Sequence, residues 1–241
     1  MRKVALICAA AVVGALGLTG VASAIQGKQG ITVSATNTRA GTKAKPRSVG
    51  KLTVVTTTSI VPGESPWAAT AATIHFDKNV VFNSSKFPKC SQSQVQLDDS
   101  KCPKGSRVGG GSAQSTLFAG TAVSGNPAPT VRAYNGSNNH LFLLVNNASP
   151  AVRAVMVGTL KPDTGKYGRK LDVLIPANLQ NVAGIIITLT QFTTRVGGTA
   201  KGTPYVGLKG CTGGKLNVKG DFFFSDNTNK SALSTANCRA S

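Results

Sequence analysis

Lys215–Phe224, with the sequence KLNVKGDFFF, decides the fold because its residues alternate in character. One set of alternate positions is apolar or small and consists of Leu216, Val218, Gly220, Phe222 and Phe224. The other set holds Lys215, Asn217, Lys219 and Asp221, with Phe223 as its one apolar member. Successive side chains of a strand point to opposite faces. This period of two therefore predicts an antiparallel strand with one buried face and one solvent-exposed face.

Outward from this stretch, further segments rich in Thr and Val alternate with turn residues, a pattern typical of strands. They cover residues 52–61, 73–82, 108–118, 130–134, 140–145, 152–160, 170–175, 184–196 and 234–238. An open sheet of roughly ten strands would curl or split. We therefore predict an all-β fold, an antiparallel two-sheet sandwich of Ig-like or jelly-roll-like type over residues 51–241. Two smaller Ig-like halves, divided near Gly125–Pro129, are the alternative.

Four local signals refine this prediction. Asp77-Lys78-Asn79 indicates a hairpin turn within residues 73–82, and Asn135-Gly136 indicates another after residues 130–134. Ser91 is placed to cap one or two helical turns that end near Leu97. The three glycines at 109–111 favour a strand that passes close to another backbone or that kinks.

Residues 1–24 resemble a secretory signal peptide. The chain opens with Met1-Arg2-Lys3, continues with an apolar run over residues 4–21, and then shows the small-residue site Ala22-Ser23-Ala24. An uncleaved membrane anchor is the alternative, but the glycines in the run and the cleavage site favour removal. We therefore expect an exported protein that is secreted or associated with the cell envelope, with no membrane span after cleavage.

The charge of the chain is strongly positive, with a formal net charge of +19 that becomes +17 without Arg2 and Lys3. Residues 25–50 are polar, lack an apolar period and contain no acidic residue, so we expect a flexible basic arm there. The candidate polyanion-binding residues are Lys28, Arg39, Lys43, Lys45, Arg47 and Lys51. An anionic cell-wall polymer or another polyanion is the expected partner, because net charge favours polyanions in general, and a highly charged soluble surface without a partner is the alternative. Specific nucleic-acid binding is not expected, because aromatic residues are not interleaved with the basic ones.

Four cysteines remain after residues 1–24: Cys90, Cys102, Cys211 and Cys238. An even number in an exported chain indicates two disulfides. Three pairings are possible, and proximity in the sequence favours Cys90–Cys102 and Cys211–Cys238. A zinc site is the competing interpretation, but the chain lacks the close Cys-x-x-Cys pair that structural zinc sites usually have.

The segment FPKCSQSQVQLDDSKCPKGSRVGGGSA at 87–113 resembles one found in exported, uncharacterised proteins of high-GC Gram-positive bacteria. The shared pattern is a Phe-Pro-x-Cys followed by Cys-Pro and Ser-x-Val-Gly, which here ends at Ser106, Val108 and Gly109. The Cys-bounded segment at 210–238 is similar to the closing part of those proteins. The resemblance implies a secreted β-sandwich with local disulfides, and it implies no activity.

The sequence contains no established catalytic or cofactor motif. A serine hydrolase would need a nucleophile, a base and an orienting acid, and no G-x-S-x-G elbow is present. His75 and Asp77 would share one face of a strand, so a secreted hydrolase with a non-standard site is the alternative function. We predict a non-catalytic binding or structural protein without metal or cofactor.

Overall fold

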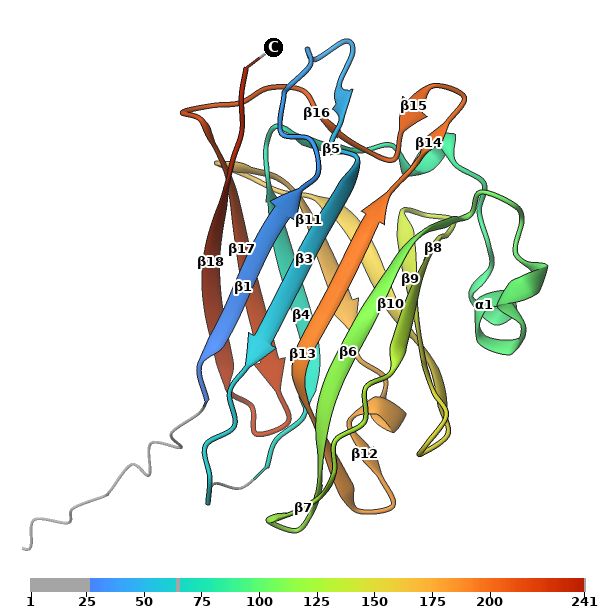
Figure 1. Cartoon of the computed structure of the whole chain (residues 1–241), viewed down its shortest axis with the longest axis vertical. Helices are drawn as coiled ribbons and strands as arrows, with labels where there is room; N and C mark the ends of the chain where they lie inside the picture. Colours follow the sequence, from blue (N-terminus) through green and yellow to red (C-terminus); the bar gives the residue numbers. More distant parts are fainter. Residues whose placement is uncertain (1–26, 64–65, 241) are drawn as a thin grey trace, which may run out of the picture.

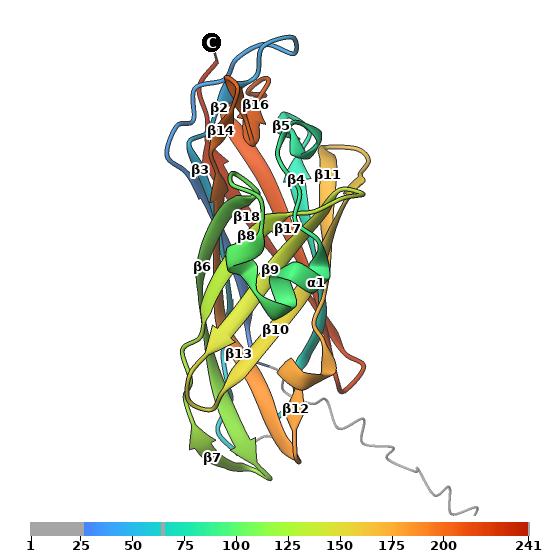
Figure 2. The same cartoon turned by 90° about the vertical axis from the view of Figure 1, so that its right-hand side faces the viewer.

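The computed structural model describes residues 27–63 and 66–240, so the signal peptide expected at 1–24 lies outside the described residues. More than half of the described residues lie in β-strands, and few are helical (Figures 1 and 2). Its strands are β1 (Gln29–Ala35), β2 (Arg47–Ser48), β3 (Lys51–Thr58), β4 (Ala69–Asp77), β5 (Val80–Phe82), β6 (Arg107–Ala119), β7 (Ala122–Gly125), β8 (Thr130–Asn135), β9 (His140–Asn147), β10 (Val152–Pro162), β11 (Tyr167–Leu174), β12 (Asn181–Val182), β13 (Ile185–Gly197), β14 (Thr199–Ala200), β15 (Thr203–Pro204), β16 (Val206–Leu208), β17 (Lys215–Phe224) and β18 (Asn229–Asn237).

Within residues 27–63 and 66–240, helical structure is confined to short segments. The α-helix α1 (Gln92–Leu97) is followed by a 3-10 turn, η2 (Asp99–Lys101). Two other 3-10 turns are η1 (Ser84–Lys86) and η3 (Ala177–Leu179). Ser91 caps α1 as predicted. Its side chain accepts a hydrogen bond from the backbone N–H of Gln94, while the Gln94 side chain accepts from the backbone N–H of Ser91.

The main sheet is a nearly closed antiparallel barrel, which corrects the predicted two-sheet sandwich. Its strands follow the order β1-β3-β13-β6-β8-β9-β10-β11-β4-β17-β18, so backbone pairing runs without a break from one end of the sheet to the other. The two end strands then meet, and the backbone N–H of Val33 in β1 donates to Oγ of Ser234 in β18 at 3.2 Å. Figure 1 shows β1 and β18 side by side.

The curvature of this sheet has a local cause. The register shifts by a residue where β6 pairs with β8 and with β13, and where β4 pairs with β11 and with β17. Such irregularities increase the bend and twist of the bulged strand. The alternation that predicted each strand defines its two faces but not its neighbours, so it could not distinguish a curled sheet from two separate ones. Pairing of β6 with β13 also excludes two separate halves.

The segment expected to be a flexible basic arm instead contributes β1 to the barrel and β2 to a separate small sheet, which is a second correction. β1 pairs with β3 over its whole length, from Gln29 opposite Thr58 to Ala35 opposite Leu52. Ile31 and Val33 of this strand are buried in the core. These two apolar residues, spaced two apart, were the available signal for a strand, and the surrounding polar composition masked it.

The turn at Asp77-Lys78-Asn79 does not form a hairpin, which is a third correction. β5 leaves the barrel after this turn and pairs with β16, which in turn pairs with β2. This small sheet lies at the same end of the barrel as the C-terminus (Figure 1). We refer to this end as the upper end.

Two apolar cores share strand β9. Leu141, Leu143 and Val145 point into the barrel, where they join the main core. Phe142 and Leu144 point outward and pack with Val95 of α1 and with Cys90. The segment from Cys90 to Cys102 therefore covers the outer face of β9 and β10.

Both predicted disulfides are confirmed. Cys90 pairs with Cys102, with 5.2 Å between their Cα atoms, and Cys211 pairs with Cys238, with 5.8 Å between theirs. The second bond joins the residues before β17 to those after its neighbour β18, as the sequence indicated.

Candidate functional site

Exposed basic residues are concentrated at the upper end of the barrel. β2 and the start of β3 lie there, together with the loop between β1 and β2, and Arg39 forms a backbone bridge to Arg239 near the C-terminus. Eight of the exposed basic residues of this cationic end are Arg39, Lys43, Lys45, Arg47, Lys51, Arg195, Lys215 and Arg239. Within residues 27–63 and 66–240, none of these eight forms an ion pair with a carboxylate.

The structure thus brings together five of the six residues that the sequence indicated for polyanion binding. Lys28 is the exception, because it precedes β1 at the lower end of the barrel, where its backbone N–H donates to Oγ of Ser59 at 2.6 Å. Three members of the cluster were missed, namely Arg195, Lys215 and Arg239. They lie far from the arm in the sequence, and only the closing of the barrel brings them near it.

The lower end of the barrel has the opposite character. Lys28 lies at this end, just before β1, but no lysine or arginine occurs in the described loops at 59–63, 66–68, 120–129, 148–151, 175–184 and 225–228. Ile60, Val123 and Val182 are exposed in or beside these loops, with relative exposures of 36%, 59% and 46%. The molecule is therefore polarised along the barrel axis, with clustered cations at one end and partly apolar loops that lack lysine and arginine at the other.

The barrel interior contains two adjoining cavities, of about 100 Å³ and about 60 Å³. Five residues line both of them: Ala69, Met156, Ile175, Leu189 and Phe192. Along β9 the lining passes from Leu141 and Leu143 in the larger cavity to Val145 and Asn147 in the smaller one. Because a strand rises about 3.3 Å per residue, the two cavities extend for about 20 Å along β9.

One polar group in the larger cavity has no hydrogen-bond partner in the part of the chain that the structure describes. Gln29 lines this cavity, and its Oε1 accepts a hydrogen bond of 2.8 Å from Oγ1 of Thr58. Its Nε2 is buried, and among the described residues no acceptor contacts it. A buried donor left unpaired costs about 1–3 kcal/mol, so an acceptor is expected at this position when the cavity is occupied.

His75 and Asp77 do not form the pair considered for a hydrolase. The two ring nitrogens of His75 contact Asp163 at 2.6 Å and Asp221 at 2.9 Å. Asp77 is buried and instead accepts from the backbone N–H groups of Asn79 and Asn217. Both nitrogens of His75 thus contact carboxylates of Asp163 and Asp221, and Asp77 is not one of its partners among the described residues.

The carboxylates around His75 are held in the ionised form. Burial opposes ionisation of Asp163 and Asp221. At Asp163 the hydrogen bonds from His75 and from the backbone of Thr164 outweigh this effect and lower the pKa of the carboxyl. At Asp221 the contacts with Ser231, Lys219 and His75 lower the pKa in the same way. Ser231 therefore donates to the Asp221 carboxylate and not to the imidazole. The contacts of His75 tie the β10–β11 turn, which carries Asp163, to β4 and β17.

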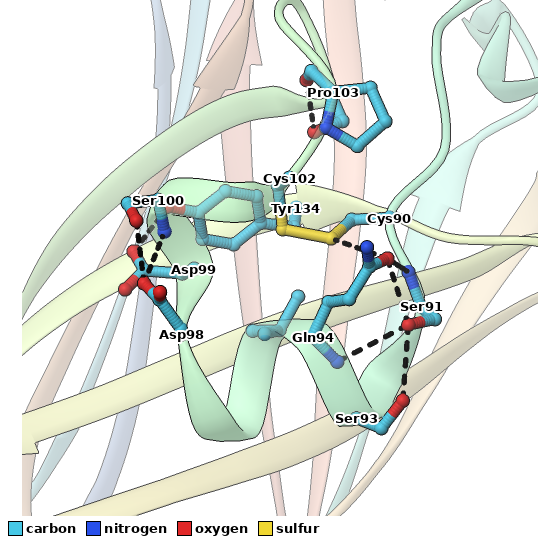
Figure 3. The surroundings of a disulfide bond; sticks show 12 residues. Cys90, Ser91, Ser93, Gln94, Asp98, Asp99, Ser100, Cys102, Pro103 and Tyr134 are labelled. Atoms are coloured by element: carbon cyan, nitrogen blue, oxygen red, sulfur yellow. Dashed lines mark hydrogen bonds between the residues drawn. A yellow bond between two sulfur atoms is a disulfide. The ribbon is translucent and has the colours of Figure 1, made fainter.

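Asp99 anchors the Cys90–Cys102 segment to the barrel. Its carboxylate accepts hydrogen bonds from Arg132 at 2.6 Å, Tyr134 at 2.5 Å and Arg153 at 2.9 Å. Burial opposes its ionisation, but these three donors hold the pKa of Asp99 far below its usual value. Figure 3 shows Tyr134 and Asp99 beside the disulfide. Asp98 instead caps η2 by accepting from the backbone N–H of Ser100.

No known protein family matches this chain, and no curated protein is significantly similar to it. Among the described residues no cluster of His, Cys, Asp and Glu could hold a metal ion. In the same part of the chain, no helix has both the length and the apolar character that crossing a membrane requires. The two disulfides are compatible with an extracellular location.

Proposed function

We propose that the protein is an exported, non-catalytic binding protein whose cationic end holds an anionic polymer of the cell envelope. The gathering of eight exposed, unpaired basic residues at one end of the barrel supports this proposal. A polymer with repeated negative charges can contact several of these residues at once, whereas a small anion would contact one or two. The signal peptide expected at residues 1–24 would deliver the protein to that location.

The acidic residues leave this end positive. Asp99 is paired with two arginines, Asp172 with Lys161, and Asp221 with Lys219. The carboxylates are thus engaged within the fold, while the cations of the upper end face solvent. Like charges held together on one surface repel each other, and an anionic partner relieves that repulsion.

Two double variants test this proposal because they remove equal charge from opposite ends. Lys43→Gln with Lys45→Gln acts at the cationic end, and Lys28→Gln with Lys230→Gln acts near the lower end. Dextran sulfate serves as the anionic polymer and neutral dextran as its uncharged counterpart. We expect wild type to bind dextran sulfate but not neutral dextran. The first variant should bind dextran sulfate about 10-fold more weakly, a loss of about 1.4 kcal/mol in binding free energy.

Salt is the second part of this test. Exposed charges interact over a Debye length of about 10 Å at 0.1 M salt and about 3 Å at 1 M, so binding should be lost at the higher concentration. Equal weakening by the two double variants would contradict a binding surface at the upper end. Binding that persists in 1 M salt, or equal binding of neutral dextran, would show that charge is not what holds the polymer.

A further inference from the structure

We propose that the barrel interior binds a single alkyl chain whose uncharged head accepts a hydrogen bond from Gln29, as in a fatty-acyl ester. This site is separate from the cationic end and does not depend on it. The inference rests on the shape of the two adjoining cavities, on the chemistry of their lining, and on the buried Nε2 of Gln29 that lacks a partner.

The shape of the space favours a linear ligand. The two cavities meet at Met156, Ile175 and Phe192, and together they form a slot along β9. A water molecule needs about 10–15 Å³ of such space, so the slot has the capacity of roughly a dozen water molecules. A methylene group is nearly as bulky as a water molecule. An alkyl chain of about twelve carbons therefore matches the slot, whereas a compact ring system would fill only part of it.

The lining favours an apolar chain over water. Most of the residues that face the slot are aliphatic or aromatic, and apolar cavities of this kind remain dry until an apolar ligand enters them. Burial of apolar surface stabilises such a complex by about 25 cal/mol for each Å² removed from water. The bound alkyl chain would thus fill space that the side chains of the barrel leave empty.

The polar groups of the slot define the head of the ligand. Gln29 and Thr58 face each other across β1 and β3, and Thr56 lies on the same inward face. The Nε2 of Gln29 needs an acceptor, which an ester carbonyl supplies. No lysine or arginine is among the residues that line either cavity. A carboxylate would therefore be buried without a counter-charge, at a cost of several kcal/mol, so a neutral head is favoured.

Trp67 provides a direct readout because it is the only tryptophan of the chain. Its ring lies 4.5 Å from that of Phe224, which lines the larger cavity. A bromine atom on a bound chain should quench its fluorescence. Three probes of matched length separate the contributions: methyl 12-bromododecanoate carries the ester, 12-bromododecanoate carries a carboxylate, and 1-bromododecane has no oxygen.

We expect the ester to bind most tightly to the intact protein, about 10-fold more tightly than 1-bromododecane, and the carboxylate to bind most weakly at neutral pH. In Gln29→Leu the affinity for the ester should fall to that for 1-bromododecane, while the affinity for the latter is unchanged. The melting temperature of Gln29→Leu without ligand should change little, because removal of the unpaired Nε2 donor offsets the loss of the hydrogen bond from Thr58. Gln114→Leu, an exposed glutamine on β6, is the matched control and should leave all three affinities unchanged.

Three outcomes would overturn the proposal. The first is no quenching of Trp67 by the ester in the intact protein. The second is a carboxylate affinity equal to or above that of the ester. The third is an unchanged preference for the ester over 1-bromododecane in Gln29→Leu. The first two need no variant, so they decide the question even if Gln29→Leu does not fold.

Discussion

Three glycines in β6 show how single residues determine which strands can lie next to each other. A Cβ added at Gly109 would lie 2.0 Å from the backbone oxygen of Arg195, and one added at Gly111 would lie 1.8 Å from that of Thr193. Both oxygens belong to β13, the neighbour of β6 in the barrel. The sequence predicted a close backbone approach at this position, and the structure confirms it.

We expect Gly111→Ala to lower the free energy of unfolding by about 3 kcal/mol, because the new methyl group would force β6 away from β13. Ser112→Ala is the matched control, because Ser112 is exposed in the same strand. Loss of its hydroxyl group should change the free energy of unfolding by less than about 0.5 kcal/mol. Denaturant unfolding measures both. Similar stability of the two variants would mean that β6 and β13 can separate without cost.

Asn135 illustrates a limit of reasoning from residue type. Asn-Gly usually occupies the centre of a tight hairpin turn, and a hairpin does join β8 to β9. The positive backbone angles, however, belong to Asn138 and Asn139. Asn135 is the fully buried last residue of β8, and its side-chain amide donates to the backbone oxygens of Ser84, Phe87 and Pro88.

At the scale of elements, the Cys90–Cys102 segment is a small unit docked on the outside of the barrel. The disulfide closes the segment, and α1 within it places Val95 over Phe142 and Leu144. Arg153 donates to the backbone oxygens of Val95 and Gln96 in α1. The carboxylate of Asp99 fixes the other end of the segment to β8 and β10.

We expect Asp99→Asn to lower the free energy of unfolding by about 2 kcal/mol at neutral pH, because charge-assisted hydrogen bonds from two arginines are lost. The pKa of Asp99 in the folded protein lies below its usual value of 3.8. Its contribution is therefore complete above about pH 4 and is lost as the pH falls through the lower, folded-state pKa. The stability difference between wild type and Asp99→Asn should narrow below pH 4.

Asp98→Asn is the control for this prediction, because asparagine caps a helical turn as well as aspartate does. Asp98 is also more exposed than Asp99, with 44% of its side-chain surface accessible compared with 10%. Its variant should be nearly as stable as wild type at neutral pH. A stability difference for Asp99→Asn that stays constant from pH 7 to pH 2 would exclude the carboxylate as the source.

At the scale of the whole molecule, closure of the barrel depends on its first and last strands. β1 and β18 lie at the two ends of the sheet, and among the described residues side-chain contacts rather than a backbone ladder join them. Ile31 and Val33 of β1 also lie beside the inward residues of β3 and belong to the same core. The barrel is therefore open along one seam, which lies beside the strand that carries Gln29.

Deletion of residues 25–50 should lower the melting temperature severely or prevent folding, whereas a flexible arm could be removed without effect. The deletion removes β1 and β2, with the buried side chains of Ile31, Val33 and Val49. Each such side chain contributes about 1.5–3 kcal/mol, and their sum approaches the total stability of a typical domain. The Lys43→Gln, Lys45→Gln variant removes charge from the same segment and should keep the wild-type melting temperature. A deletion mutant as stable as wild type would contradict a structural role for β1.

The all-β class, most of the individual strands, the capped helix and both disulfides follow from local sequence. Alternation, turn residues and cysteine spacing are properties of neighbouring residues, so they can be recognised without knowledge of the fold. The predicted strand at 215–224 coincides with β17. The basic residues of the arm were recognised in the same way, by their closeness in the chain.

The closed arrangement of the sheet, the cavities and the position of Gln29 depend on tertiary structure alone. β6 pairs with β13 across a long stretch of sequence, and β1 meets β18 from the opposite end of the chain. Alternation determines which face of a strand is apolar but does not identify the partner that it packs against. Gln29 in the sequence is one polar residue in a basic segment. It becomes a buried donor because pairing with β3 directs it into the barrel, and a cavity exists there because side chains from distant strands do not fill the space between them.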